Sequence, residues 1–180
     1  MGLFENPMYQ ETALIIVGFL FTLSVLFFFL RNKGTLWAAA WASIKSWWFA
    51  GPIILIALAL PTPWPLIFLT FVSIMSSKTF FQMTGMYHRT YFVWLTYAFI
   101  VGLGWIIFRD IPGLYNMMPM IFMGSLVCIP LIRNSATDMI QYMALSLMAF
   151  IFFGWSFMHL GRLLEFEKGP FIVLYLYLLT

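Results

Sequence analysis

Residues 90–108 read TYFVWLTYAFIVGLGWIIF, and none of these 19 side chains is charged. An α-helix rises about 1.5 Å per residue, so about 20 apolar residues cross a hydrocarbon core about 30 Å thick. The stretch ends at Arg109 and Asp110, whose charges are suited to a water-facing boundary. The sequence therefore predicts a membrane-spanning helix at these residues.

Apolar stretches of similar length recur on both sides of this helix. Three of them contain no Lys, Arg, Asp or Glu, namely Thr12–Leu30, Leu114–Ile132 and Met139–Leu160. Two more are expected to span, Ser46–Leu60 and Trp64–Met83, although the first is short and whether it crosses fully is left open. Pro61, Pro63 and Pro65 predict a tight turn between these two, because proline is tolerated just past a helix end or at its first turn.

The composition excludes an ordinary soluble domain. Apolar residues make up 63% of the chain and charged residues 8%, whereas soluble domains average roughly 45–50% and about 25%. The net charge is +3, but the basic residues are scattered between apolar runs, so we expect no nucleic-acid partner. The predicted fold class is all-α: a polytopic transmembrane helix bundle of about six spans plus a truncated seventh.

We expect residues 1–180 to form a single transmembrane domain. Residues 1–11 form an N-terminal tail, and residues 31–45 form either an interfacial amphipathic helix or an ordinary loop. Residues 171–180 begin a further helix, whose nine apolar residues would cover only about 14 Å. Either this segment rests at the membrane interface or the chain is the N-terminal part of a longer protein, and we expect the second.

Lysine and arginine predict the orientation, because they are enriched in cytoplasmic loops. If all six spans cross, six basic residues share one face and three lie on the other. The richer face is expected to be cytoplasmic, which places the N-terminus outside. The six are Arg31, Lys33, Lys45, Lys78, Arg89 and Arg133, and the three are Arg109, Arg162 and Lys168.

Two residues inside or at the end of apolar spans are candidates for chemistry. Lys78 lies late in Trp64–Met83, where an ionisable group either faces a cavity or partner or extends to the interface. A lysine at that place could attract a phosphate headgroup. His159 could bind a metal or move a proton, or simply form interfacial hydrogen bonds.

The acidic residues do not predict a metal centre. All six acidic residues lie outside the predicted spans, and no phosphate-binding glycine loop or HExxH string is present. The single cysteine, Cys128, excludes an intramolecular disulfide. We therefore assign no catalytic residue and no metal ligand in this chain.

Several strings, taken in order, resemble the N-terminal half of the phosphatidate cytidylyltransferase (CDP-diacylglycerol synthase) family, and its short bacterial branch in particular. They are RNKG at residues 31–34, SIKSWW at residues 43–48, LTFVSIMSSKTF at residues 69–80, Gly154-Trp155 followed by His159, and LYLYLLT at residues 174–180. Thr79 stands where the family usually has Glu, and the family's paired aspartates belong to its C-terminal half.

The resemblance implies transfer of the cytidylyl group of CTP to phosphatidate in a bacterial inner membrane. It implies Mg²⁺, with ligands outside this chain, and it implies substrate-binding roles for Lys45, Trp47, Lys78 and His159. Membrane lipids are expected partners, and a homodimer is one arrangement to test. The alternative function is a non-catalytic membrane module: a transporter half, an assembly subunit or a lipid-binding scaffold.

Overall fold

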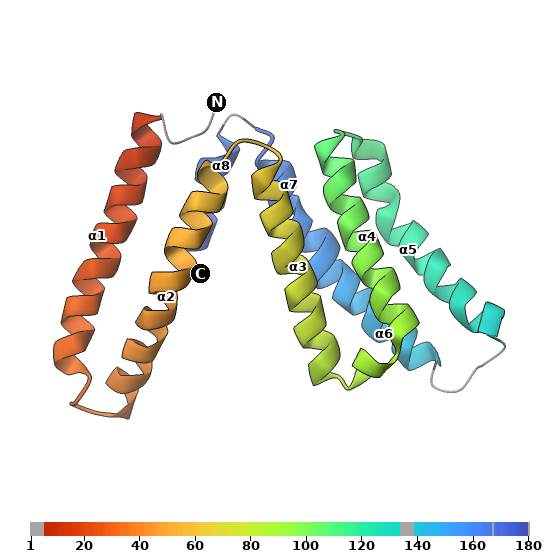
Figure 1. The fold of residues 1–180 in the computed structure, drawn as a ribbon, viewed down its shortest axis with the longest axis horizontal. Helices are drawn as coiled ribbons and strands as arrows, with labels where there is room; N and C mark the ends of the chain where they lie inside the picture. The colour runs from red at the N-terminus through yellow and green to blue at the C-terminus, as the bar shows by residue number, and fades with distance from the viewer. Residues whose placement is uncertain (1–5, 134–138, 167, 180) are drawn as a thin grey trace. The chain divides into compact units, whose positions relative to one another are not determined.

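The computed structural model describes residues 6–133, 139–166 and 168–179, and every regular element in these segments is a helix. Figure 1 shows the elements in chain order. They are α1 (Pro7–Leu30), α2 (Thr35–Ala59), α3 (Trp64–Met83), the 3₁₀ turn η2 (Met86–His88), α4 (Thr90–Phe108), α5 (Pro112–Arg133), α6 (Met139–Ala149), the π-helical segment η3 (Phe150–Ser156), α7 (Phe157–Leu163) and α8 (Gly169–Leu179).

Six helices in the described segments are long and apolar enough to cross a membrane. Five of them are α1 to α5, and the sixth is the continuous run Met139–Leu163, which contains α6, η3 and α7. The prediction of an all-α, multi-pass membrane protein is confirmed. The chain divides into two compact units, Met1–Pro65 and Leu66–Thr180, and each is described by itself.

The first unit is an antiparallel pair of helices. The Trp48 indole N–H donates to Ser24 Oγ at 2.7 Å, and the Trp41 ring meets Phe28 at 5.7 Å. Near the other end of the pair, the Tyr9 hydroxyl donates to the carbonyl oxygen of Leu55. Residue numbers fall along α1 as they rise along α2, so the two helices run in opposite directions.

Two predicted boundaries in this unit differ from the structure. The helix predicted from Thr12 begins at Pro7, because the side chain of Asn6 accepts the Met8 amide at 3.0 Å and proline suits a first turn. The predicted separate segment 31–45 is not separate, since its residues from Thr35 onward form the first turns of α2. The helix also continues through Pro52 instead of starting near it. Residues 1–5 of the predicted tail and Thr180 lie outside the described residues.

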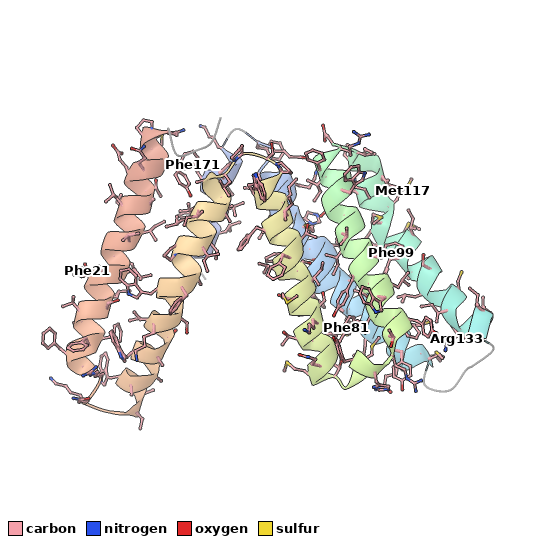
Figure 2. All side chains as sticks on the ribbon, viewed as in Figure 1. Phe21, Phe81, Phe99, Met117, Arg133 and Phe171 are labelled. Atoms are coloured by element: carbon pink, nitrogen blue, oxygen red, sulfur yellow. The ribbon has the colours of Figure 1, made fainter. Side chains whose placement is uncertain are left out.

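The second unit holds α3, α4, α5 and the run from α6 to α7 around one apolar core. Phe122 and Phe150 are fully buried with ring centroids 4.3 Å apart, and Phe99 meets Phe122 at 5.0 Å. Phe81 on α3 is also fully buried, and Figure 2 shows it with Phe99 among the side chains of this unit. Contacts among these rings, and between Phe81 and Tyr97, connect α3, α4, α5 and η3 around a common centre.

Helix directions follow from pairs of contacting residues. Gly161 on α7 packs closely against Leu66 on α3, since a Cβ atom added at Gly161 would lie 2.9 Å from Leu66 Cδ2. The start of α3 therefore lies beside the end of α7. Arg133 at the end of α5 lies over the ring of Tyr91 at the start of α4. The start of α3, the end of α4, the start of α5 and the end of α7 therefore meet at one end of the unit. The opposite ends of these helices meet at the other.

The segment η3 is a seven-residue π-helix inside the sixth span. Its backbone oxygens accept side-chain hydrogen bonds from two neighbouring helices: Phe153 from the Ser73 hydroxyl on α3, and Trp155 from the Tyr115 hydroxyl on α5. π-helical turns are uncommon and are often found at functional sites. The side chains around Trp155 are therefore candidates for a functional site.

Candidate functional site

A group of polar and aromatic side chains lies at the end of the second unit where α4 ends, α5 begins and α7 ends. Tyr115 on α5 is 3% exposed, although it carries a hydroxyl, while His159 on α7 is exposed. Hydrogen bonds, ion pairs and ring contacts connect all the members. We call this group the His159 cluster: Asp110, Tyr115, Trp155, His159, Arg162 and Glu165.

Three atoms at the centre of the cluster lie within hydrogen-bond distance of one another. The Tyr115 hydroxyl lies 2.8 Å from the Trp155 carbonyl oxygen and 2.9 Å from His159 Nδ1, and Nδ1 lies 2.8 Å from the same carbonyl oxygen. A proton on Nδ1 makes both side chains donors to the carbonyl oxygen and leaves Nε2 as an acceptor. A proton on Nε2 instead lets Nδ1 accept from the hydroxyl. Both arrangements use a neutral imidazole.

The rings of the cluster hold this hydrogen-bonded centre in place. The His159 imidazole meets the Trp155 ring edge-on at 4.6 Å and the Tyr115 ring at 5.3 Å. In return, the Trp155 indole N–H donates to the Tyr115 carbonyl oxygen at 3.3 Å. α5 and the sixth span are therefore locked together by hydrogen bonds in both directions.

At the edge of the cluster, Arg162 forms ion pairs with two carboxylates. Arg162 Nη1 lies 3.2 Å from Asp110 Oδ1 and 3.1 Å from Glu165 Oε2. Asp110 has a positive φ of 49°, a turn conformation that aspartate tolerates. Partial burial raises the pKa of the Glu165 carboxyl above its ordinary value; Arg162 opposes that rise and Asp110 adds to it. The charges of these three side chains therefore largely satisfy one another.

Two of the predicted substrate-binding residues lie in the first unit. Lys45 and Trp47 are both on α2, where Lys45 is exposed and Trp47 is partly buried. The ammonium group of Lys45 lies 5.5 Å from the centre of the Trp41 ring. The lysine is therefore held against an aromatic surface, as is common for basic residues near a membrane interface.

The other two predicted residues lie in the second unit but at different levels. Lys78 is partly buried on α3, five residues before the helix ends at Met83, and no described residue forms an ion pair or hydrogen bond with it. Gly161, two residues after His159, packs against Leu66, which lies 12 residues before Lys78 on α3. That spacing is about 18 Å along a helix, so the two side chains do not share one site.

The sequence did not single out Tyr115 or Tyr142. Tyr115 is central to the His159 cluster, and the Tyr142 hydroxyl receives a hydrogen bond from Arg89 at 3.0 Å. Tyrosine is common near the ends of membrane spans, so its presence there does not by itself indicate a functional role. Only the packing of α5 against η3, and of α4 against α6, distinguishes these two.

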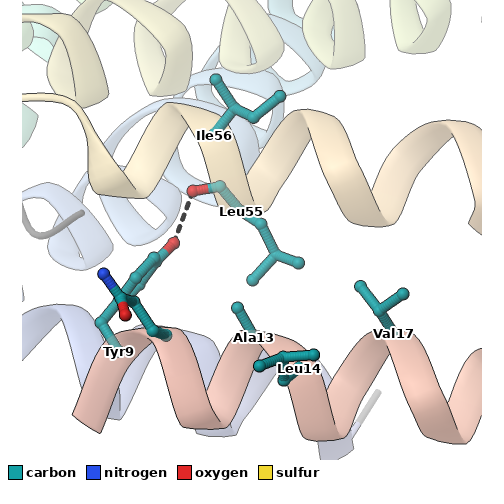
Figure 3. A pocket seen from close by; sticks show the side chains of 7 residues that line it. Tyr9, Ala13, Leu14, Val17, Leu55 and Ile56 are labelled. Carbon is teal, nitrogen blue, oxygen red and sulfur yellow. Dashed lines mark hydrogen bonds between the residues drawn. The ribbon is translucent and has the colours of Figure 1, made fainter. Parts of the chain in front are cut away.

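A cavity of about 450 Å³ lies between α1 and α2 within the first unit. Its lining is almost wholly apolar, and the hydrogen bond from Tyr9 to the Leu55 carbonyl closes one end of it (Figure 3). Such a surface suits a hydrocarbon chain better than a nucleotide. The residues that line it are Tyr9, Gln10, Ala13, Leu14, Val17, Leu55 and Ile56.

The described residues do not fit the Mg²⁺ that the resemblance implies. Nowhere in these segments do three or more His, Cys, Asp or Glu side chains come together in a way that could hold a metal ion. Asp110 and Glu165 both already contact Arg162. In comparisons with known proteins, no family model, no curated protein and no solved structure matches this chain.

Proposed function

We propose that this chain is the membrane portion of a CDP-diacylglycerol synthase-like enzyme of phospholipid biosynthesis, located in a bacterial inner membrane. In that reaction a phosphate oxygen of phosphatidate attacks the α-phosphorus of CTP. The bond to the leaving pyrophosphate breaks, and CDP-diacylglycerol forms. The proposal is supported by the order of the strings from RNKG at residues 31–34 to LYLYLLT at residues 174–180, and by a multi-pass helical architecture suited to a lipid substrate.

Lys78 is the observation on which the proposal mainly depends. An ammonium group that is partly buried in an apolar helix is costly without an anion near it. Among the described residues, nothing supplies that anion. A phosphatidate headgroup, which carries up to two negative charges, would pair with Lys78 at a depth about 7.5 Å from the helix end at Met83.

The proposal divides the reaction between this chain and other residues. Lys78 contributes lipid binding, while the metal and the triphosphate require carboxylates of a kind that the described residues do not bring together. Those ligands would come from a further segment or a partner polypeptide. His159 has no headgroup role here, because it lies about 18 Å from Lys78 along the helices.

Incorporation of radiolabelled CTP into lipid tests the proposal. The assay uses membranes that contain this chain together with the polypeptide that carries the catalytic carboxylates. Lys78→Ala should raise the KM for phosphatidate roughly tenfold, because a charge-assisted contact is lost. Lys168→Ala is the matched control, since Lys168 is an exposed lysine near the start of α8, and its KM should not change.

Two results would count against the proposal in different ways. Absence of label in lipid for the unmodified protein would reject the enzyme. Normal KM and kcat for Lys78→Ala would keep the enzyme but remove Lys78 from its lipid site.

The separation of Lys78 from His159 favours a second candidate, a non-catalytic membrane module. A transporter half, an assembly subunit or a lipid-binding scaffold needs no converging catalytic residues. The two candidates differ in a simple way: a scaffold binds lipid without consuming CTP. Phosphatidate binding by the purified chain, with no CTP turnover when any candidate catalytic partner is added, would select the module.

A further inference from the structure

The end of the second unit opposite the His159 cluster carries arginines in a different setting. Arg89 immediately precedes α4, and Arg133 is the last residue of α5. Both are exposed, and both lie against tyrosine rings: Arg89 over Tyr142 at 4.5 Å and Arg133 over Tyr91 at 3.6 Å. We call these four residues the Arg89–Arg133 face, and Arg133 is labelled in Figure 2.

We propose that the Arg89–Arg133 face binds the phosphate of an anionic phospholipid headgroup. The inference does not rest on the proposed cytidylyltransferase activity, because any phospholipid with a net negative charge satisfies it. A guanidinium group offers a planar pair of donors that matches two phosphate oxygens. Stacking on a tyrosine ring orders the guanidinium while leaving donor edges directed away from the ring.

Charge is distributed unevenly between the two ends of the unit. Among the described residues of the second unit, the acidic side chains are Asp110 and Glu165, and both contact Arg162 in the His159 cluster. In the same described segments, no carboxylate forms an ion pair with Arg89 or Arg133. The positive charge of this face is therefore available to an external anion.

The position of the two arginines identifies the source of that anion. Arg89 borders a 19-residue apolar helix and Arg133 ends a 22-residue one, so both lie where an apolar span ends. That level of a membrane holds the lipid phosphates, and tyrosine is enriched there. A leaflet presents phosphate at this depth permanently, whereas a soluble anion must diffuse to it. A membrane lipid is therefore the occupant that the geometry favours.

Native mass spectrometry of the purified chain can test this binding directly. The chain is equilibrated with equal amounts of phosphatidylglycerol and phosphatidylcholine, and the retained lipids are counted. We expect a preference for phosphatidylglycerol that falls roughly tenfold in Arg89→Gln/Arg133→Gln, because each basic residue near an anionic surface contributes separately. If the double variant fails to fold, the single variants serve, each with an expected loss of about three- to fivefold.

Arg109→Gln is the matched control. Arg109 also lies over an aromatic ring at a helix end, 5.6 Å from the centre of Trp105, but next to Asp110 at the opposite end of the unit. Its loss should leave the preference unchanged. An undiminished preference in the folded double variant, or an equal loss in Arg109→Gln, would overturn the inference. Displacement of the retained lipid by millimolar inorganic phosphate would also overturn it, since the anion would then be a soluble one.

Discussion

Arg162 at one end of the second unit and Arg89 and Arg133 at the other have opposite surroundings. Arg162 lies between two carboxylates and near the buried Tyr115, so its charge is neutralised within the protein. Arg89 and Arg133 lie against tyrosine rings, and no described carboxylate pairs with them. The same residue type at similar positions in apolar helices therefore serves structure at one end and, by our proposal, lipid binding at the other.

This difference has a physical origin in what each partner can offer. A carboxylate removes the charge from an arginine and fixes its direction, whereas a tyrosine ring fixes the direction and leaves the charge. The Arg162 end should therefore contribute to folding and respond weakly to lipid composition. The Arg89–Arg133 face should show the reverse, and the predictions below test that contrast.

The largest expected effect is the loss of Tyr115. Tyr115→Ala removes a buried ring, its two hydrogen-bond contacts and its stacking against Trp155, so we expect about 3 kcal/mol of destabilisation. Tyr142→Ala is the counterpart at the other end and should cost about 1 kcal/mol, because that side chain is only partly buried. Thermal unfolding in detergent, followed by size-exclusion fluorescence, measures both. Equal losses would show that the two ends contribute equally to stability.

A smaller effect is expected from the arginines themselves. Arg162→Gln leaves Asp110 and Glu165 without their shared cation, and we expect a loss of about 1 kcal/mol for this partly exposed network. Arg133→Gln breaks no described ion pair and should change stability by less than about 0.5 kcal/mol. The same thermal assay applies. A greater loss in Arg133→Gln than in Arg162→Gln would reverse the assignment of structural and binding roles.

Much of the fold is predictable because an apolar segment of sufficient length is expected to be surrounded by lipid and therefore to form a helix. The segments Thr90–Phe108 and Trp64–Met83 were predicted with the bounds that the structure has. The errors lie where a helix continues past the apolar core. Thr35–Lys45 is less hydrophobic than a span, yet its rings at Trp37 and Trp41 pack on Phe27 and Phe28, and this packing favours one continuous helix.

The candidate site was less predictable than the fold. His159 could be selected from the sequence because a histidine at the end of an apolar span is unusual, but its partner Tyr115 lies 44 positions away. The π-helical register of η3 also has no signature in composition, since it depends on how neighbouring helices pack. The role of Lys78 stays a prediction: the structure places it in an apolar helix with no described partner, and the identity of its ligand is what the CTP assay addresses.

The smallest expected effect is a dependence of stability on pH at the Arg162 end. The pKa of Glu165 is raised in the folded protein, so the folded state binds its proton more tightly than the unfolded state. Stability should therefore fall slightly as pH rises through the interval between the ordinary carboxyl pKa and the raised one. Glu165→Gln removes this titrating group, and the difference in unfolding temperature between the two proteins should change as pH rises through that interval. A difference that stays constant would mean that Arg162 fully offsets the burial of Glu165, and that this end is electrostatically balanced without a bound proton.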